Sequence, residues 1–141
     1  MKIILALMAT LTAIYVVSLP AQEITNPADT YVFRNDDRPE YNKNLSVDEL
    51  KALKNADDIT LIDVRLTEDF ALDPTLIPGA QYRDPEMIAS WADLFPKDKK
   101  VVLYCVKGAW VSHKAATYLN EKGYDVSTLD GGINSWKASE E

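Results

Sequence analysis

Cys105 is the only cysteine among the 141 residues, and it opens the segment CVKGAWVS at residues 105–112. A cysteine acts as a nucleophile in its thiolate form, which nearby positive charge and hydrogen-bond donors stabilise. The loop contains Gly108, and a helical period begins near Val111, so several backbone N–H groups are expected to lie close to the sulfur. The segment therefore predicts a reactive cysteine in an anion-binding loop.

Three other side chains of this region have competing interpretations. Lys107 is expected to attract an anionic substrate that the net charge of −7 would otherwise repel, although a loop lysine is often only solvated. Trp110 is expected to form a wall of the pocket, with a place in the core as the alternative. His113 falls in the first turn of the predicted helix, where its side chain is expected to face solvent, so we assign it no catalytic role.

The composition argues against several other kinds of chemistry. The basic residues are scattered along an acidic chain, which disfavours a nucleic-acid partner. One cysteine cannot form an internal disulfide. One cysteine and one histidine fall short of the usual zinc ligand sets, so no metal site is predicted.

The N-terminus has the pattern of a signal peptide at residues 1–21. An apolar run at residues 3–17 follows Lys2, and the small residue Ala21 is suited to cleavage. The run is shorter than the ~20 apolar residues that span a bilayer. We therefore expect a periplasmic or secreted protein, with a retained N-terminal membrane anchor as the alternative. No cysteine lies near the cleavage region, which excludes a lipoprotein anchor.

The rest of the chain divides into an arm and one domain. Residues 22–44 are polar and lack a clear apolar period, which indicates an extended arm. Its apolar side chains are expected to attach it to the domain surface: Tyr31, Val32, Phe33 and Tyr41. Residues 45–141 have about the size of a single domain with its own core.

Three short apolar runs predict buried strands at residues 59–64, 101–104 and 126–129. Helical segments separate these runs, which is typical of parallel strands with helices on both faces of the sheet. The predicted class is therefore α/β, in a three-layer α/β/α arrangement with a central, mostly parallel sheet. Substrates of such folds bind beyond the carboxyl ends of the strands, where both Asp63 and Cys105 fall.

Caps and apolar spacing predict the helices. Ser46 and Glu49 form a capping box for a short helix, and Thr67 is expected to cap a helical turn at residues 67–70. A helix is predicted at residues 85–94, another at residues 111–122, and a last short one after Gly131 and Gly132. The helix at 85–94 is expected to bury one apolar stripe: Met87, Ile88, Trp91 and Leu94.

Five motifs follow one another in the domain: LIDVR at 61–65, IPGA at 77–80, VVLYC at 101–105, KAATYLNEKGY at 114–124 and DGGINSW at 130–136. In their order and spacing they resemble the rhodanese family, and the resemblance covers residues 45–136. Each motif alone is weak, but the five together are specific.

The resemblance implies a sulfurtransferase that works by double displacement and needs no cofactor. Cys105 would take the outer sulfur of an anionic donor such as thiosulfate, or of a persulfide, and pass it from a persulfide to a thiol or cyanide. The N–H groups of the following loop would form the substrate pocket, and Asp63 and Arg65 would support it. The loop residues so assigned are Val106, Lys107, Gly108, Ala109, Trp110 and Val111.

The loop departs from the family pattern in two respects: it lacks an arginine, and it is one residue longer when the helix is aligned through Ala115 and Ala116. Family loops have an arginine near the position of Trp110, and this chain has none in the loop. The loop also resembles the longer one of rhodanese-fold phosphatases and arsenate reductases, in which an arginine grips the oxyanion, but Val111 occupies that position here. Two alternatives to a sulfurtransferase therefore stay open: a binding or sulfur-relay module without turnover that docks to a partner protein, and a phosphatase or arsenate reductase.

Overall fold

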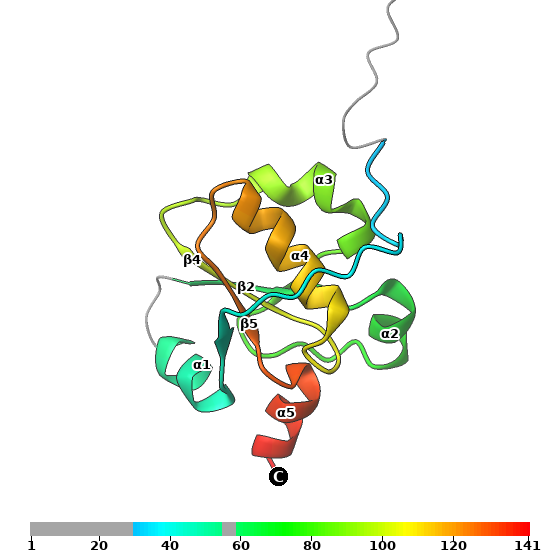
Figure 1. Ribbon diagram of the computed structural model, residues 1–141. Helices are drawn as coiled ribbons and strands as arrows, with labels where there is room; N and C mark the ends of the chain where they lie inside the picture. The colour runs from blue at the N-terminus through cyan, green and yellow to red at the C-terminus, as the bar shows by residue number, and fades with distance from the viewer. Residues whose placement is uncertain (1–29, 55–58) are drawn as a thin grey trace, which may run out of the picture.

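A five-stranded sheet forms the centre of the described part of the chain, residues 30–54 and 59–141 of a computed structural model (Figure 1). The predicted signal peptide at 1–21 and the first part of the arm lie outside these residues. The strand order is β1-β5-β4-β2-β3, and every pairing is parallel, which confirms the α/β class. The strands are β1 (Asn44–Leu45), β2 (Ile59–Asp63), β3 (Gln81–Tyr82), β4 (Lys100–Tyr104) and β5 (Val126–Leu129).

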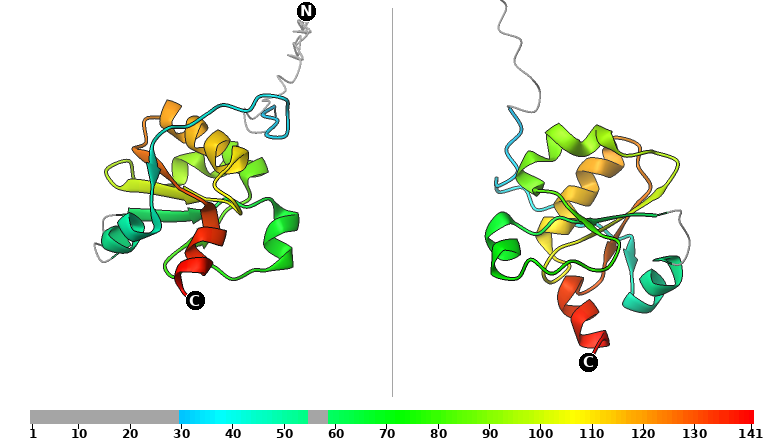
Figure 2. Two further views of the ribbon diagram at one scale, coloured as in Figure 1. Left: turned by 60° about the horizontal axis from the view of Figure 1, so that its bottom comes forward. Right: turned by 180° about the vertical axis from the view of Figure 1, so that it is seen from behind.

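Helices cover both faces of this sheet (Figure 2). Successive side chains of a strand point to opposite faces, so Leu103 packs under α4 and Val102 packs on the side of α1 and α5. The α-helices are α1 (Val47–Lys54), α2 (Thr67–Leu72), α3 (Ile88–Trp91), α4 (Trp110–Glu121) and α5 (Gly132–Ser139). Within the described ranges, no helix is both long and apolar enough to cross a membrane.

The capping box at the start of α1 is confirmed. The Glu49 N–H donates to the Ser46 hydroxyl oxygen at 3.1 Å, and the Ser46 N–H donates to the Glu49 carboxylate at 2.7 Å. These two bonds satisfy backbone donors that a helix N-terminus otherwise leaves free. The helix then buries Leu50 against the sheet.

The prediction of one regular helix at residues 85–94 is wrong. A short α3 lies between two 3₁₀ turns, η2 (Pro85–Met87) and η3 (Ala92–Leu94). The 3₁₀ geometry rotates the end residues away from the apolar face. Ile88 and Trp91 are therefore buried, whereas Met87 and Leu94 are 55% and 69% exposed.

Two other local predictions need correction. Thr67 is the first residue of α2 rather than its cap, since Leu66 holds the cap position and offers no side-chain acceptor. The strands β1 and β3 were not expected from the sequence, because two residues are too short to show an alternating pattern.

The arm packs on the domain as predicted, with one exception. Phe33 is buried in the core, and Tyr31 and Tyr41 pack against the same cluster. Val32 is 61% exposed and does not take part. The arm ends in the sheet itself, since β1 begins at Asn44.

Candidate active site

Cys105 follows the last residue of β4 and points to the face that α4 covers. Its side chain is 4% exposed, and its thiol donates to the Ser112 hydroxyl oxygen, with 3.2 Å between Sγ and Oγ. The Ser112 hydroxyl in turn donates to the Ala109 carbonyl at 3.3 Å. A hydroxyl can rotate, so the same group can donate to the sulfur once the thiol has lost its proton. Ser112 was not among the predicted site residues.

The loop after Cys105 has unused hydrogen-bond donors. Within residues 30–54 and 59–141, the backbone N–H groups of residues 106–112 donate to no protein acceptor. Ala109 precedes α4 and provides no side-chain cap, so the first turn of this helix also keeps its donors free. Free N–H groups and a helix N-terminus together favour a bound anion.

The carbonyl groups of the cysteine loop are held from the other side by α5. The Cys105 carbonyl accepts from the Ile133 N–H at 2.9 Å, and the Val106 carbonyl accepts from the Asn134 N–H at 3.1 Å. Gly132 makes this approach possible, since a Cβ on it would lie 2.5 Å from the Cys105 carbonyl oxygen. The first turn of α5 therefore holds the cysteine loop in place, a role that the sequence analysis did not predict.

A pocket with a cavity volume of about 290 Å³ opens over Cys105. It brings together most of the predicted site residues, together with Leu66 and Asp69, which were not predicted. Gly108 is absent from the lining because it packs against the turn before α5. His113 is absent as well. The lining residues are Arg65, Leu66, Asp69, Cys105, Val106, Lys107, Ala109, Trp110 and Val111.

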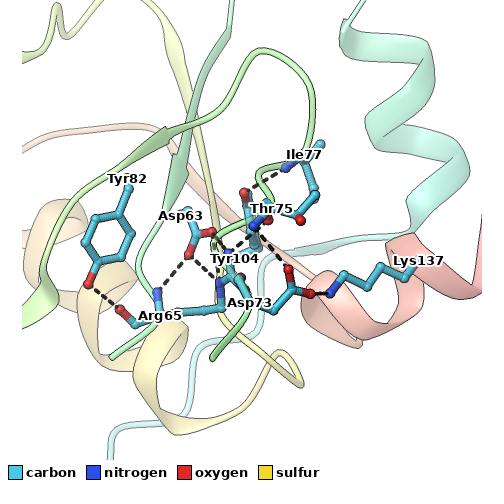
Figure 3. Close-up of polar contacts among 8 residues, drawn as sticks. All are labelled: Asp63, Arg65, Asp73, Thr75, Ile77, Tyr82, Tyr104 and Lys137. Atoms are coloured by element: carbon cyan, nitrogen blue, oxygen red, sulfur yellow. Dashed lines mark hydrogen bonds and ion pairs between the residues drawn. The ribbon is translucent and has the colours of Figure 1, made fainter. Parts of the chain in front are cut away.

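Asp63 and Arg65 form a buried ion pair beside this pocket (Figure 3). Arg65 donates from Nε and Nη2 to the Asp63 carboxylate at 2.7–3.1 Å, and both side chains are at most 2% exposed. Burial alone lowers the pKa of Arg65, but the hydrogen bonds and charge of Asp63 outweigh it and raise that pKa above its usual value. The two side chains therefore form an ion pair of the interior rather than of the surface.

Arg65 also binds the segment that follows α2. Its Nη1 donates to the Asp73 carbonyl at 2.8 Å, and its Nη2 donates to the Thr75 carbonyl at 3.0 Å. Tyr104, the neighbour of Cys105, accepts a hydrogen bond from the Ile77 N–H at 3.1 Å, and burial raises its pKa. Only Arg65 of the ion pair lines the pocket, while Asp63 lies behind it and orients it.

Lys107 and Trp110 differ in their surroundings. Lys107 is exposed at the pocket, which fits both a residue that attracts anions and a solvated loop lysine. Trp110 is half-buried, and it both lines the pocket and packs against the core, so the two interpretations of this residue are not exclusive.

A free cysteine at the carboxyl end of a parallel strand, followed by a loop whose N–H groups have no protein acceptor among the described residues, is an arrangement of α/β proteins that suits a nucleophilic thiol. Residues 46–139 match the rhodanese-like domain family, and the chain belongs to this family. The activity supported at family level is that of a sulfurtransferase.

Two curated relatives carry that activity in their names. A sulfurtransferase of Allochromatium vinosum is 36% identical over 85 residues, which cover 60% of this chain and 77% of the relative. The thiosulfate sulfurtransferase GlpE of Pseudomonas fluorescens is 32% identical over 80 residues, which cover 56% of this chain and 71% of that protein.

Solved structures show the same fold. A rhodanese-like domain protein of Staphylococcus aureus superimposes with a TM-score of 0.60 and 28% identity, over 67% of this chain and 91% of that one. A protein of unknown function from Rhodopseudomonas palustris, named a possible tyrosine phosphatase, has a TM-score of 0.62 and 28% identity, over 70% of this chain and 81% of that one.

Proposed function

We propose that this protein is a sulfurtransferase that carries a sulfane sulfur as a persulfide on Cys105. The observation that carries the proposal is the position of the thiol beneath a loop whose N–H groups, at residues 106–112, have no protein acceptor in the described part of the chain. This arrangement suits a small anion or the negative charge of a persulfide.

The reaction has two balanced displacements. In the first, the Cys105 thiolate attacks the outer sulfur of thiosulfate, the S–S bond of the donor breaks, and sulfite leaves with the electron pair. In the second, cyanide or a thiolate attacks the outer sulfur of the persulfide, the S–S bond to Cys105 breaks, thiocyanate or a new persulfide leaves, and the Cys105 thiolate is restored with the electron pair of that bond. The loop N–H groups stabilise the negative charge of both the Cys105 thiolate and its persulfide. Ser112 donates to the Cys105 sulfur in the thiolate state.

A single set of assays tests the proposal. Protein is mixed with thiosulfate and cyanide, and thiocyanate is measured, with Cys105→Ser as the matched variant. Intact mass after treatment with thiosulfate alone is expected to show a gain of one sulfur atom, absent in Cys105→Ser. Neither thiocyanate nor a sulfur adduct in the wild type would sink the proposal.

The same assays separate the alternatives. A sulfur adduct without thiocyanate turnover would indicate a relay module that hands its sulfur to a partner protein. Release of phosphate from an aryl phosphate, lost in Cys105→Ser, would indicate a phosphatase, as the name of the Rhodopseudomonas palustris structure suggests for that protein. We favour sulfur transfer because Val111 stands where a phosphatase needs an arginine.

We also propose that the protein works outside the cytoplasm. This rests on the pattern of residues 1–21 alone. N-terminal sequencing of the protein from a bacterial expression host is expected to begin at Gln22 in a periplasmic fraction. An intact N-terminus in the membrane fraction would instead support the anchor.

A further inference from the structure

The arm that precedes the rhodanese-like region lies along α4, the helix that starts at the cysteine pocket. In Figure 1 the arm, coloured blue to cyan, passes across this helix. The Tyr31 ring lies 4.8 Å from the Tyr118 ring. The Lys114 ammonium, which is buried, donates to the Asn35 side-chain oxygen and to the Asp37 carbonyl. These contacts attach the arm to α4.

Two residues of the arm contact Trp110, a wall of the pocket. The guanidinium carbon of Arg38 lies 3.9 Å from the centroid of the indole ring, which is within the range of a cation–π interaction. The Phe33 ring lies 5.8 Å from the same indole. The Trp110 side chain therefore contacts both the Arg38 guanidinium and the cavity over Cys105.

The guanidinium of Arg38 is oriented but not neutralised. Its Nη1 donates to the carbonyls of Asn35 and Asp37 in its own arm. In the described part of the chain, its Nε and Nη2 groups have no protein acceptor, which leaves three N–H donors for a ligand. An exposed arginine with free donors is suited to bind an oxyanion.

Without Arg38, the two cations that line the pocket, Lys107 and Arg65, are matched in number by two carboxylates. Asp69 is in the lining, and Asp63 pairs with Arg65 from behind it. A dianion that approaches this pocket also meets the field of a chain with a net charge of −7. One additional cation beside Trp110 therefore strengthens the attraction of the pocket for anions.

We propose that Arg38 is a specificity-determining residue that draws anionic sulfur donors to Cys105. Family loops carry an arginine near the position of Trp110, and Arg38 supplies from the arm the positive charge that this loop does not have there. The identity of the donor rests on the proposed function above. The preference for anions is a property of the pocket that can be measured without any turnover.

The first test compares two alkylating reagents of similar shape. Iodoacetate carries a negative charge and iodoacetamide is neutral, and both modify the thiolate of Cys105, the only cysteine of the chain. At low salt, Arg38→Gln is expected to lower the ratio of the iodoacetate rate to the iodoacetamide rate about threefold. The ratio removes any general change in the reactivity of the thiol.

Two matched variants make this test decisive. Lys99→Gln removes the same charge from an exposed residue before β4, at the opposite end of that strand from Cys105, and is expected to leave the ratio unchanged. Arg38→Lys keeps the charge and is expected to keep most of the ratio. An unchanged ratio in Arg38→Gln, an equal loss in Lys99→Gln, or a full loss in Arg38→Lys would each overturn the proposal.

The second test uses the sulfur-transfer reaction. Arg38→Gln is expected to raise the KM for thiosulfate three- to tenfold and to leave kcat within about twofold, since the residue acts on donor binding rather than on the sulfur. A wild type that transfers no sulfur yet prefers iodoacetate contradicts the proposed function alone. An active wild type with the same KM as Arg38→Gln contradicts the role of Arg38.

Discussion

The Ser112 hydroxyl is placed to form a hydrogen bond with the Cys105 sulfur both as a thiol and as a thiolate. Its hydroxyl contacts both Cys105 Sγ and the Ala109 carbonyl, and it is completely buried. With the thiol, it accepts from sulfur and donates to the carbonyl. With the thiolate, the same proton can turn toward the sulfur.

We predict that Ser112→Ala slows the chemistry at Cys105. Loss of one hydrogen bond to a charged sulfur corresponds to ~1.5 kcal/mol, or roughly a tenfold fall in the rate of alkylation by iodoacetamide at neutral pH. Ser90→Ala is the control, because Ser90 is an exposed serine that donates only to the Met87 carbonyl in the described structure. Equal rates in Ser112→Ala and wild type would show that the hydroxyl does not stabilise the thiolate.

At the scale of elements, the cysteine loop depends on the helix that follows β5. The loop carbonyls at Cys105 and Val106 bind the first N–H groups of α5, and Gly132 lies between the two segments with φ +61°. A side chain there would meet three backbone atoms at 2.5–2.7 Å, none of which can move without displacing the loop.

We predict that Gly132→Ala destabilises the protein by about 3 kcal/mol or more. The positive φ contributes ~1–2 kcal/mol and the backbone overlap adds to it. Gly79→Ala isolates the first effect, since Gly79 has φ +87° but nothing within 4 Å of its added Cβ. Urea unfolding measures both variants, and the explanation fails if the two lose the same free energy of unfolding.

At the scale of the whole molecule, one network of hydrogen bonds and ion pairs joins the sheet to the segment at residues 73–77 and to α5. It is buried at Asp63 and Arg65 and half-exposed at Asp73 and Lys137. Arg65 binds Asp63 and the carbonyls of Asp73 and Thr75, and Asp73 forms an ion pair with Lys137 of α5 (Figure 3). The network thereby orders the region beside the pocket.

We predict that Asp63→Asn costs about 3–5 kcal/mol of unfolding free energy. The change leaves the buried Arg65 guanidinium without a charge partner. Asp125→Asn is the matched control, because Asp125 pairs with Lys43 at the surface, where such a loss is ~0–1 kcal/mol. Chemical denaturation that showed similar losses for both variants would contradict the role of the buried pair.

The sequence by itself determined the parallel α/β fold, the position of Cys105 at a strand end and the capping box of α1. These features follow from local rules, because apolar runs define strands and a serine three residues before a glutamate defines a helix start. The five rhodanese motifs added the family, since their order and spacing reflect the whole domain.

Only the tertiary structure decided which distant residues complete the site. The hydrogen bonds from α5 to the Cys105 loop, the burial of Arg65 and the position of Arg38 on Trp110 each join segments that are separated along the chain. No local period encodes such contacts, because they depend on how strands pair and on where loops close. The cysteine at the strand end was therefore visible in the sequence, whereas the charge and shape of its pocket were not.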